Sequence, residues 1–343
     1  MPACQRGVPA FPHNSAGLLR LIEGYRIYSD AEGKSPKTIE TVAGSVKLLW
    51  QFLTNAGLST STDSIGPDEL RAFILDLKRR PCFSNHPYAR PQERSLSPHS
   101  VNTYLRSIRA FWSWLEEEGI ITDNPFDRVK VPKAPRKVVA TFTETQIRDL
   151  LAAIDTSTAE GQRDYLIIIL FLDTAVRLSE LSGLTLDDLR LDDGILKVMG
   201  KGSKERLIPV GRFTQRVLWR YLNLVRPLPL NPRCISLFLT IDGLPMTGHH
   251  IRKRIILYGK IAGIRGVRCS PHTIRHTAAV NFLRNGGNVF VLQRLLGHTS
   301  LNMTRHYCEL ADVDVQRAHA TASPVDNLML SGIPGDRRKW RGK

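Results

Sequence analysis

The chain has 343 residues, of which 42% are hydrophobic and 23% charged, and its net charge is +16. This composition excludes a disordered chain, and the length suffices for two domains that each bury a core. Most of the positive charge lies late in the chain: residues 1–135 hold 17 Lys/Arg against 14 Asp/Glu, and residues 136–343 hold 31 against 18. Residues 197–306 carry 19 basic side chains and only 2 acidic ones. That imbalance favours nucleic acid over an acidic membrane surface as the partner.

The cysteines and the apolar runs indicate the compartment. The 5 cysteines are scattered and form no C-x-x-C pair, which argues against a disulfide framework and a zinc site and favours a reducing cytoplasm. The apolar run from Tyr165 to Leu172 has only 8 residues, too few to cross a membrane. The N-terminus lacks the basic stretch followed by an apolar one that marks an export signal.

The first third of the chain predicts a helical bundle. Residues 1–14 contain three prolines and no periodicity, so we expect them to be unstructured. Beyond them, apolar residues recur at helical spacing, and Ser-Pro pairs mark two of the helix starts. Four helices with one apolar face each make a small bundle. They are expected from Leu18 to Tyr28, from Pro36, from Pro67, and from Pro98 to Gly119.

Three features accompany this bundle. Residues 79–97 read as a loop rich in Pro and Arg that is long for a helical domain. Phe111 and Trp112 lie on the apolar stripe of the fourth helix, which favours a place in the core over a platform for stacking bases. From Asn124 to Pro135 repeated prolines predict an extended linker.

The second half begins with a capping box, in which Thr143 and Gln146 start a helix. The buried run from Tyr165 to Leu172 leads directly to Arg177. Two strands, 195–199 and 206–210, flank a Gly-Lys-Gly-Ser turn and predict a hairpin with Lys201 exposed at its tip. Helical patterns follow at 213–225 and 249–262, so this half is mostly helical with one small sheet.

Within residues 272–307, four polar groups have spacings that a phosphoryl-transfer site could use, and two of them lie at helix or loop edges: His272, Arg275, His298 and Tyr307. Ser270 and Pro271 start a helix that places His272 and Arg275 on one face, and Gly286-Gly287 ends it. A second helix spans 289–296, and His298 follows directly. Ser300 then caps a short third helix that carries Tyr307. His272 and His276 could also be read as a zinc pair, but the glutamate of H-E-x-x-H is absent and Arg275 would face the metal.

Three motifs together resemble the tyrosine recombinase family, and most closely its Xer-like branch. They are T-A-V-R-L-S-E-L at 174–181, G-K-G-S-K-E-R at 200–206, and H-x-x-R, L-L-G-H and a tyrosine nine residues on, within 272–307. The family usually has glycine where Ala175 stands. That departure concerns the local backbone geometry.

The resemblance implies a set of catalytic roles. Phosphodiester transfer builds negative charge on the nonbridging oxygens, and arginine meets it with a permanently charged planar fork. Arg177 and Arg275 would therefore bind the scissile phosphate. Tyr307 would attack it to form a covalent phosphotyrosine, which conserves the bond energy without ATP, a metal or another cofactor.

Proton transfer and support fall to four further residues by the same resemblance. Lys201 would protonate the departing 5′-oxygen; Lys204 is the alternative for the lysine at the hairpin tip, and the alignment of the motif favours Lys201. His272 would accept the tyrosine proton, and His298 would donate a hydrogen bond to a phosphate oxygen. Glu180 would orient the active-site groups.

The implied fold is mainly α: an N-terminal four-helix core-binding (SAM-like) domain and an α-rich catalytic domain with a small antiparallel β-sheet. In the core-binding domain, basic residues of the helices would contact phosphates, with ordinary solvated charges as the alternative. The domains are expected at 1–14 (disordered), 15–123 (core-binding), 124–140 (linker), 141–320 (catalytic) and 321–343 (tail). The basic residues are Lys34, Lys37, Lys47, Arg106 and Arg109.

The resemblance implies a cytoplasmic site-specific DNA recombinase whose partner is double-stranded DNA with a specific recombination site. It would act as a homo-tetramer on DNA or as a hetero-tetramer with a paralogue. Residues 311–330 could dock on a neighbouring protomer or fray. Two other functions stay open: an enzyme like the type IB topoisomerases, which relaxes supercoils without strand exchange, and a DNA-binding protein that kept the fold without catalysis.

Overall fold

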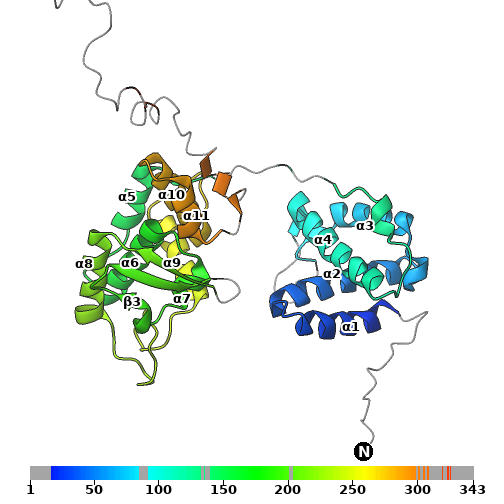
Figure 1. Cartoon of the computed structure of the whole chain (residues 1–343), viewed down its shortest axis with the longest axis horizontal. Coiled ribbons are helices and arrows are strands. Elements are labelled where there is room, and N and C mark those ends of the chain that lie inside the picture. The colour runs from blue at the N-terminus through cyan, green and yellow to red at the C-terminus, as the bar shows by residue number, and fades with distance from the viewer. Residues whose placement is uncertain are drawn as a thin grey trace, which may run out of the picture. The chain divides into compact units, whose positions relative to one another are not determined.

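The computed structural model describes residues 17–84, 92–132, 135, 140–200, 204–298, 300, 301, 304, 305, 307, 308, 319, 323 and 325. The chain divides into two compact units, residues 1–137 (unit 1) and 138–343 (unit 2) (Figure 1). Helices dominate both units, and each also has a small antiparallel sheet. The mainly α class predicted from the sequence is therefore confirmed.

Unit 1 contains the four predicted helices. They are amphipathic, and the side chains of Ser35 and Ser97 accept hydrogen bonds from the backbone of the first turns of α2 and α4. Each of these serines is followed by a proline, whose fixed φ suits the first helical position. Gly119 has φ +68° just beyond α4. The helices are α1 (Leu18–Ala31), α2 (Pro36–Asn55), α3 (Pro67–Arg79) and α4 (Pro98–Glu117), with a 3₁₀ turn η1 (Thr62–Ser64) before α3.

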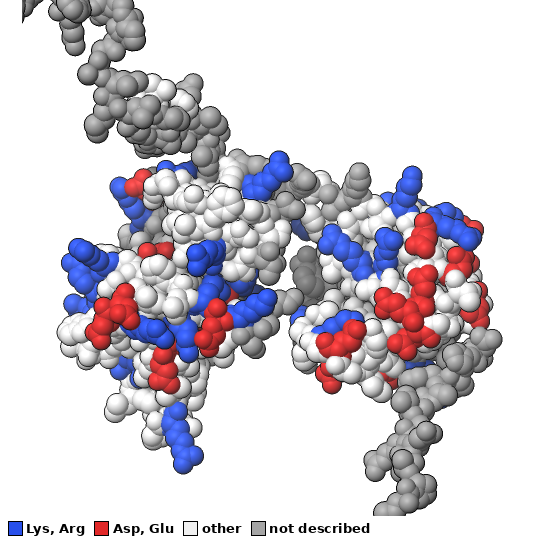
Figure 2. Space-filling model, in the orientation of Figure 1, with Lys and Arg blue, Asp and Glu red and all other residues white. Residues whose placement is uncertain are grey.

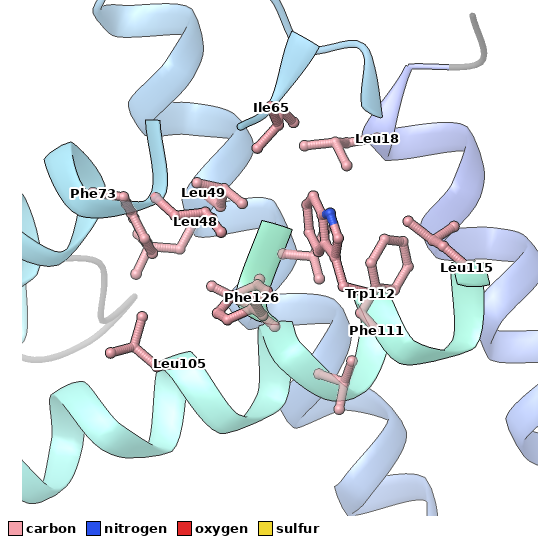
Figure 3. Packing of buried hydrophobic residues seen from close by; sticks show 14 of the residues in the cluster. Leu18, Leu48, Leu49, Ile65, Phe73, Leu105, Phe111, Trp112, Leu115 and Phe126 are labelled. Atoms are coloured by element: carbon pink, nitrogen blue, oxygen red, sulfur yellow. The ribbon is translucent and has the colours of Figure 1, made fainter. Parts of the chain in front are cut away.

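The core of unit 1 lies between these helices (Figure 3). Phe111 and Trp112 of α4 are fully buried in it, and their ring centroids lie 5.6 Å apart. The ring of Trp112 also packs against Phe126 at 6.0 Å. Both α4 aromatics are therefore core residues, as the apolar stripe predicted.

Two predictions for unit 1 need correction. The segment expected to be a loop at 79–97 contains an antiparallel pair, β1 (Pro81–Cys82) and β2 (Gln92–Ser95). The segment expected to be an extended linker begins with a 3₁₀ turn, η2 (Pro125–Arg128). There Asn124 accepts a hydrogen bond from the backbone N–H of Phe126, whose ring is buried in the core of unit 1. Burial of an aromatic ring outweighs the preference of the prolines for extended chain.

Unit 2 is built around α6 (Ala159–Thr174), which packs on α8 (Arg212–Arg220), α9 (Gly248–Ile261) and α10 (Pro271–Arg284) (Figure 1). This central position explains why Tyr165 to Leu172 is almost continuously apolar. The Thr143–Gln146 capping box is formed at the start of α5. The remaining helices are α5 (Glu144–Ala152), α7 (Leu178–Ser182), η3 (Leu186–Asp188), the π-helical η4 (Tyr221–Val225) and α11 (Val289–Leu296).

The sheet of unit 2 has the strand order β3-β4-β5, all antiparallel. Its strands are β3 (Leu189–Arg190), β4 (Ile195–Met199) and β5 (Glu205–Pro209). The predicted hairpin is thus confirmed, with Met199 paired to Glu205 and the backbone N–H of Gly200 donating to the carbonyl of Lys204. The loop residues 201–203 lie outside the described residues.

A buried ionic group joins α6 to α9. Asp164 is 1% exposed and accepts hydrogen bonds from Arg163, Arg254 and the hydroxyl of Tyr258. Arg163 also donates to the carbonyl oxygen of Leu239. Buried charges need such partners, because an unpaired buried charge costs several kcal/mol, about 3–5 when one partner is removed. The group therefore fixes α9, which lines the cleft described below, against the central helix.

The C-terminal part of the chain agrees with the predicted helices over the residues that the structure describes. α10 begins at Pro271 behind the cap Ser270, and Gly286 takes φ +85° after its end. Residues 301, 304, 305, 307 and 308 are helical, in agreement with a third short helix that carries Tyr307. The predicted disordered segment 1–14 lies outside the described residues, as do most of the predicted docking segment and tail. Among the described helices, none is long and apolar enough to span a membrane.

Candidate active site

A cleft of about 780 Å³ in unit 2 collects five of the six residues predicted to be catalytic. Its walls come from the segment after α6, from α9, from α10 and from the C-terminal helix. It is strongly basic, since Arg252 and Arg268 line it as well. The five predicted residues are Arg177, His272, Arg275, His298 and Tyr307.

One carboxylate, Glu180, holds Arg177 of the cleft and Arg206 together. Glu180 of α7 accepts hydrogen bonds from the backbone N–H of Arg177 at 2.7 Å and from its Nη1 at 2.8 Å. Arg206 of β5 donates to both oxygens of the same carboxylate, at 2.9 and 2.8 Å. Burial alone would raise the pKa of Glu180, but the hydrogen bonds from Arg206 and Arg177 outweigh it and lower the pKa to about 2. Glu180 is therefore a fixed anion between two guanidinium groups.

Arg275 is held by main-chain oxygens and not by a carboxylate at hydrogen-bond distance. Its side chain is 5% exposed. Nη1 donates to the carbonyl oxygen of Ala175 at 2.7 Å, and Nη2 donates to that of Leu296 at 2.8 Å. Burial and the nearby positive charge of Arg177 lower the pKa of Arg275 to about 10. The guanidinium thus stays charged at neutral pH, with the Glu180 carboxylate 3.9 Å from Nη1, and it can bind an anion.

The departure from the family pattern at Ala175 has a visible structural consequence. Ala175 ends α6 in the left-handed region, with φ +50° and ψ +30°. An alanine there costs roughly 1 kcal/mol relative to glycine, which adopts this conformation freely. The same backbone turn aims the carbonyl oxygen of Ala175 at Arg275. The glycine geometry of the motif is therefore retained by a residue that adopts it at some cost.

His298 follows the left-handed Gly297, which has φ +62° and ends α11. Its Nδ1 lies 3.0 Å from the hydroxyl of Thr304, and its Nε2 lies 3.4 Å from Nη2 of Arg275. Burial and the positive charges of Arg275, Arg177 and Arg206 lower the pKa of His298 to about 4. His298 is therefore neutral at physiological pH. Because a guanidinium can only donate, Nη2 of Arg275 donates to Nε2 of His298 in this structure, and the Nδ1–H of His298 donates to the Thr304 hydroxyl.

His272 lies one turn before His276 on α10, and the Nε2 atoms of the two rings are 2.7 Å apart. Burial, together with the positive charge of Arg275, lowers the pKa of His272. The direct contact disfavours the zinc interpretation, because two nitrogens on one tetrahedral zinc ion would lie about 3.3 Å apart.

Tyr307 is 4% exposed and lies against both histidine neighbours. Its ring centroid is 5.1 Å from that of His276 and 6.1 Å from that of His298, and it stacks on the His298 ring. Burial raises the pKa of Tyr307, while the positive charges of Arg275 and Arg177 and a hydrogen bond from Arg275 oppose that rise. Burial outweighs the two guanidinium groups, so the pKa of Tyr307 is raised on balance and the phenol keeps its proton until a base takes it.

The sixth predicted residue, Lys201, lies outside the described residues. Lys204, the alternative, is exposed at the base of the hairpin loop. Sequence reasoning did not single out Arg206 or Thr304. Arg206 stood inside the quoted motif at 200–206, whereas nothing in the sequence marked Thr304, which becomes a partner of His298 only through the fold.

The fold and the site define a class of protein. Residues 140–313 match the phage integrase family, and the chain belongs to it. It is a tyrosine-type site-specific recombinase, which cuts and rejoins DNA strands through a covalent 3′-phosphotyrosine intermediate.

Particular relatives narrow the branch to the Xer-like one. The chain is 35% identical to tyrosine recombinase XerD of Xanthomonas axonopodis pv. citri over 73% of its own length and 84% of the relative's. It is 37% identical to XerD of Neisseria meningitidis serogroup B over 62% of this chain and 72% of the relative.

Solved structures show the same fold at lower identity. The Tn1549 transposon integrase in complex with transposon right end DNA is 21% identical, with a TM-score of 0.67 over 92% of this chain and 100% of that chain. The XerH site-specific recombinase bound to a palindromic difH substrate is 19% identical, with a TM-score of 0.65 over 91% of this chain and 86% of that chain.

Proposed function

We propose that the cleft of unit 2 is the site of strand cleavage and that Tyr307 is its nucleophile. The observation that carries this assignment is the convergence of Tyr307, His298, Arg275 and Arg177 around one basic cleft from sequence positions up to 130 residues apart. Arg177 and Arg275 bind the nonbridging oxygens of the scissile phosphate, and they neutralise the charge that builds there. Neutral His298 donates a hydrogen bond from Nε2 to one of these oxygens in its other tautomer, in which the Thr304 hydroxyl donates to Nδ1.

The reaction needs two proton transfers. When the oxygen of Tyr307 attacks phosphorus, its proton passes to His272, and the bond between phosphorus and the 5′-oxygen breaks. The departing 5′-oxygen takes a proton from Lys201 on the hairpin between β4 and β5. Glu180 and Arg206 act through Arg177: they fix its guanidinium, and their hydrogen bonds tie β5 of the hairpin to α7. Rejoining is the same sequence in reverse.

The substrate is double-stranded DNA with a specific recombination site, and strand exchange requires four active sites. We therefore propose a homo-tetramer on DNA, or a hetero-tetramer with a paralogue. The basic excess of unit 2 supports the DNA partner, and Lys and Arg side chains lie at several places on the face that Figure 2 shows. Unit 1 is the core-binding domain in this proposal. A cytoplasmic location fits the scattered cysteines.

The test is covalent capture of DNA by the full chain. A binding site is first selected from random-sequence duplexes, and a nicked version of it then lets the cleaved end diffuse away, which traps the phosphotyrosine. We expect a covalent adduct with the chain and none with Tyr307→Phe. Tyr165→Phe is the matched control, because it removes the same hydroxyl from α6 at a separate pocket and should leave the adduct intact.

Other outcomes separate the alternatives. An adduct that survives in Tyr307→Phe would reject the nucleophile. Selective binding without any adduct would indicate a non-catalytic DNA-binding protein. Relaxation of supercoiled plasmid by a monomer, without exchange between two sites, would indicate an enzyme like the type IB topoisomerases.

A further inference from the structure

His276 is the buried histidine of the cleft to which the proposed reaction gives no part. It lies on α10, is 7% exposed, and its ring packs 5.1 Å from the ring of Tyr307. Its Nε2 lies 2.7 Å from Nε2 of His272, with the two rings almost perpendicular at 85°. The residue therefore contacts both the nucleophile and the group that takes the nucleophile's proton.

A hydrogen bond between two Nε2 atoms holds one proton. Two protons would repel each other, and none would leave two lone pairs facing at 2.7 Å. If His276 donates, Nε2 of His272 accepts, and the Nδ1–H of neutral His272 can only donate to a ligand. If His272 donates, its Nδ1 has a lone pair and can accept a proton. Only the second arrangement lets His272 act as a base through Nδ1.

We infer that His276 is a positioning residue that accepts the Nε2–H of His272 and so keeps Nδ1 of His272 free to take the proton of Tyr307. This inference rests on the proposed function. In the step, the O–H bond of Tyr307 breaks, its proton binds Nδ1 of His272, and the oxygen electron pair forms the bond to phosphorus. His272 becomes an imidazolium, and the charge-assisted hydrogen bond from its Nε2–H to neutral His276 stabilises it.

The surroundings of the pair make this support necessary. Burial and the positive charge of Arg275 both disfavour the imidazolium form of His272 and lower its pKa. The glutamate of this site, Glu180, is engaged by Arg177 and Arg206, so a neutral acceptor performs the task that a carboxylate performs in a Ser-His-Asp triad. The charged and titratable groups that line the same cleft are Arg177, Arg252, Arg268, Arg275, His298 and Tyr307.

The experiment measures single-turnover cleavage of the nicked duplex by the full chain between about pH 5 and 9, a range that spans ordinary histidine titration. His276→Phe keeps a ring against Tyr307 and removes the acceptor. His276→Gln keeps an acceptor oxygen at nearly the reach of Nε2. We expect His276→Phe to cleave about 10- to 100-fold more slowly, the loss expected for a hydrogen bond to a charged group, with its acid limb at lower pH. The cleavage rate of His276→Gln should stay within about threefold of the wild-type rate.

Two further variants separate positioning from folding. If His276 acts through His272, then His272→Ala and the double variant His272→Ala/His276→Phe cleave at equal rates. DNA affinity and thermal unfolding are measured for every variant. If His276→Phe does not fold, His276→Asn replaces it, because its amide is too short to reach His272.

The inference is overturned if removing the acceptor leaves rate and pH profile unchanged, if His276→Gln is as slow as His276→Phe, or if the double variant is slower than His272→Ala alone. Failure of the proposed function gives a different result, since the unchanged chain would then form no adduct or Tyr307→Phe would still form one.

Discussion

Replacement of Glu180 by glutamine should destabilise unit 2 strongly although it changes one atom type. Glu180 is 6% exposed and neutralises two guanidinium groups at hydrogen-bond distance. Glu180→Gln leaves Arg177 and Arg206 facing an amide that can accept at one oxygen and must turn its N–H₂ towards one of the cations. Removal of one partner from a buried ion pair costs about 3–5 kcal/mol.

The pKa of Glu180 gives an independent magnitude. It falls from 4.5 in the unfolded chain to about 2 in the folded one, and each pKa unit corresponds to about 1.4 kcal/mol, so the carboxylate contributes about 3 kcal/mol. Because the folded pKa is the lower one, this contribution is complete above about pH 4.5 and is lost as the pH falls towards 2. The two routes agree on a cost of about 3 kcal/mol at neutral pH.

The assay is urea unfolding of the full chain followed by circular dichroism at pH 7 and at lower pH. The transition of unit 2 should move to lower urea in Glu180→Gln, while that of unit 1 stays in place. Glu144→Gln is the control, because Glu144 forms an exposed pair with Arg148 in which both side chains are more than 75% exposed, and such pairs contribute at most about 0.5 kcal/mol. A loss below about 1 kcal/mol in Glu180→Gln, or an equal loss in the control, would refute the reasoning.

Three further outcomes are expected. Gly297→Ala should destabilise unit 2 by more than the roughly 1 kcal/mol that the left-handed backbone costs an alanine, because the added Cβ would lie 3.1 Å from Nη1 of Arg206. Gly263→Ala is the control in the same urea assay. Gly263 has the same φ of +62° with nothing within 4 Å of the added Cβ, so this variant should show the backbone strain alone. Asp164→Asn should bring the pKa of Tyr258 down from about 12, since burial and the Asp164 carboxylate together raise it; an ultraviolet titration compared with Tyr258→Phe measures this, and an unchanged pKa would contradict it. Folding lowers the pKa of His298 from 6.5 to about 4, so its contribution to the free energy of unfolding is complete above pH 6.5 and is lost as the pH falls towards 4. His298→Gln should therefore flatten the plot of unfolding free energy against pH in that range. A slope equal to that of the wild-type chain would show that His298 is not the titrating group.

The helix starts of this protein were predictable because they depend on local chemistry. Ser35, Ser97 and Ser270 each precede a proline, and in each case the serine side chain accepts a hydrogen bond from the first turn of the helix. Such a cap needs only three or four consecutive residues. The hairpin of β4 and β5 was predictable for the same reason, because turn residues separate two apolar strands.

Features that depend on distant contacts were predicted less well. Prolines near Asn124 indicated extended chain, but Phe126 folds back because a hydrophobic pocket beside Trp112 accepts its ring. Arg206 occupies an ordinary position in a strand, and its role appears only when β5 lies beside α7 and α11. Spacing in a sequence can place residues on one helix face, but it cannot tell which carboxylate a long arginine side chain will reach.

The active site contains both residues that the sequence predicted and a contact that it did not. The family resemblance singled out Arg177, Arg275, His298 and Tyr307, and the structure brings them together. His276 was considered only as a possible metal ligand, because a spacing of four residues on a helix suits both a metal pair and a hydrogen-bonded pair. The distance between the two Nε2 atoms distinguishes them.

The anchoring of Arg275 on the carbonyl oxygens of Ala175 and Leu296 bears on how such a protein can diverge. Every amino acid supplies the same carbonyl, so substitutions near these positions can accumulate while the guanidinium keeps its place, provided the backbone path is maintained. Substitutions are therefore constrained more at the turns at Ala175 and Gly297, where the backbone conformation holds Arg275, than at other nearby side chains. Attempts to retarget the enzyme to new DNA should accordingly vary surface side chains freely and leave the bends at Ala175 and Gly297 untouched.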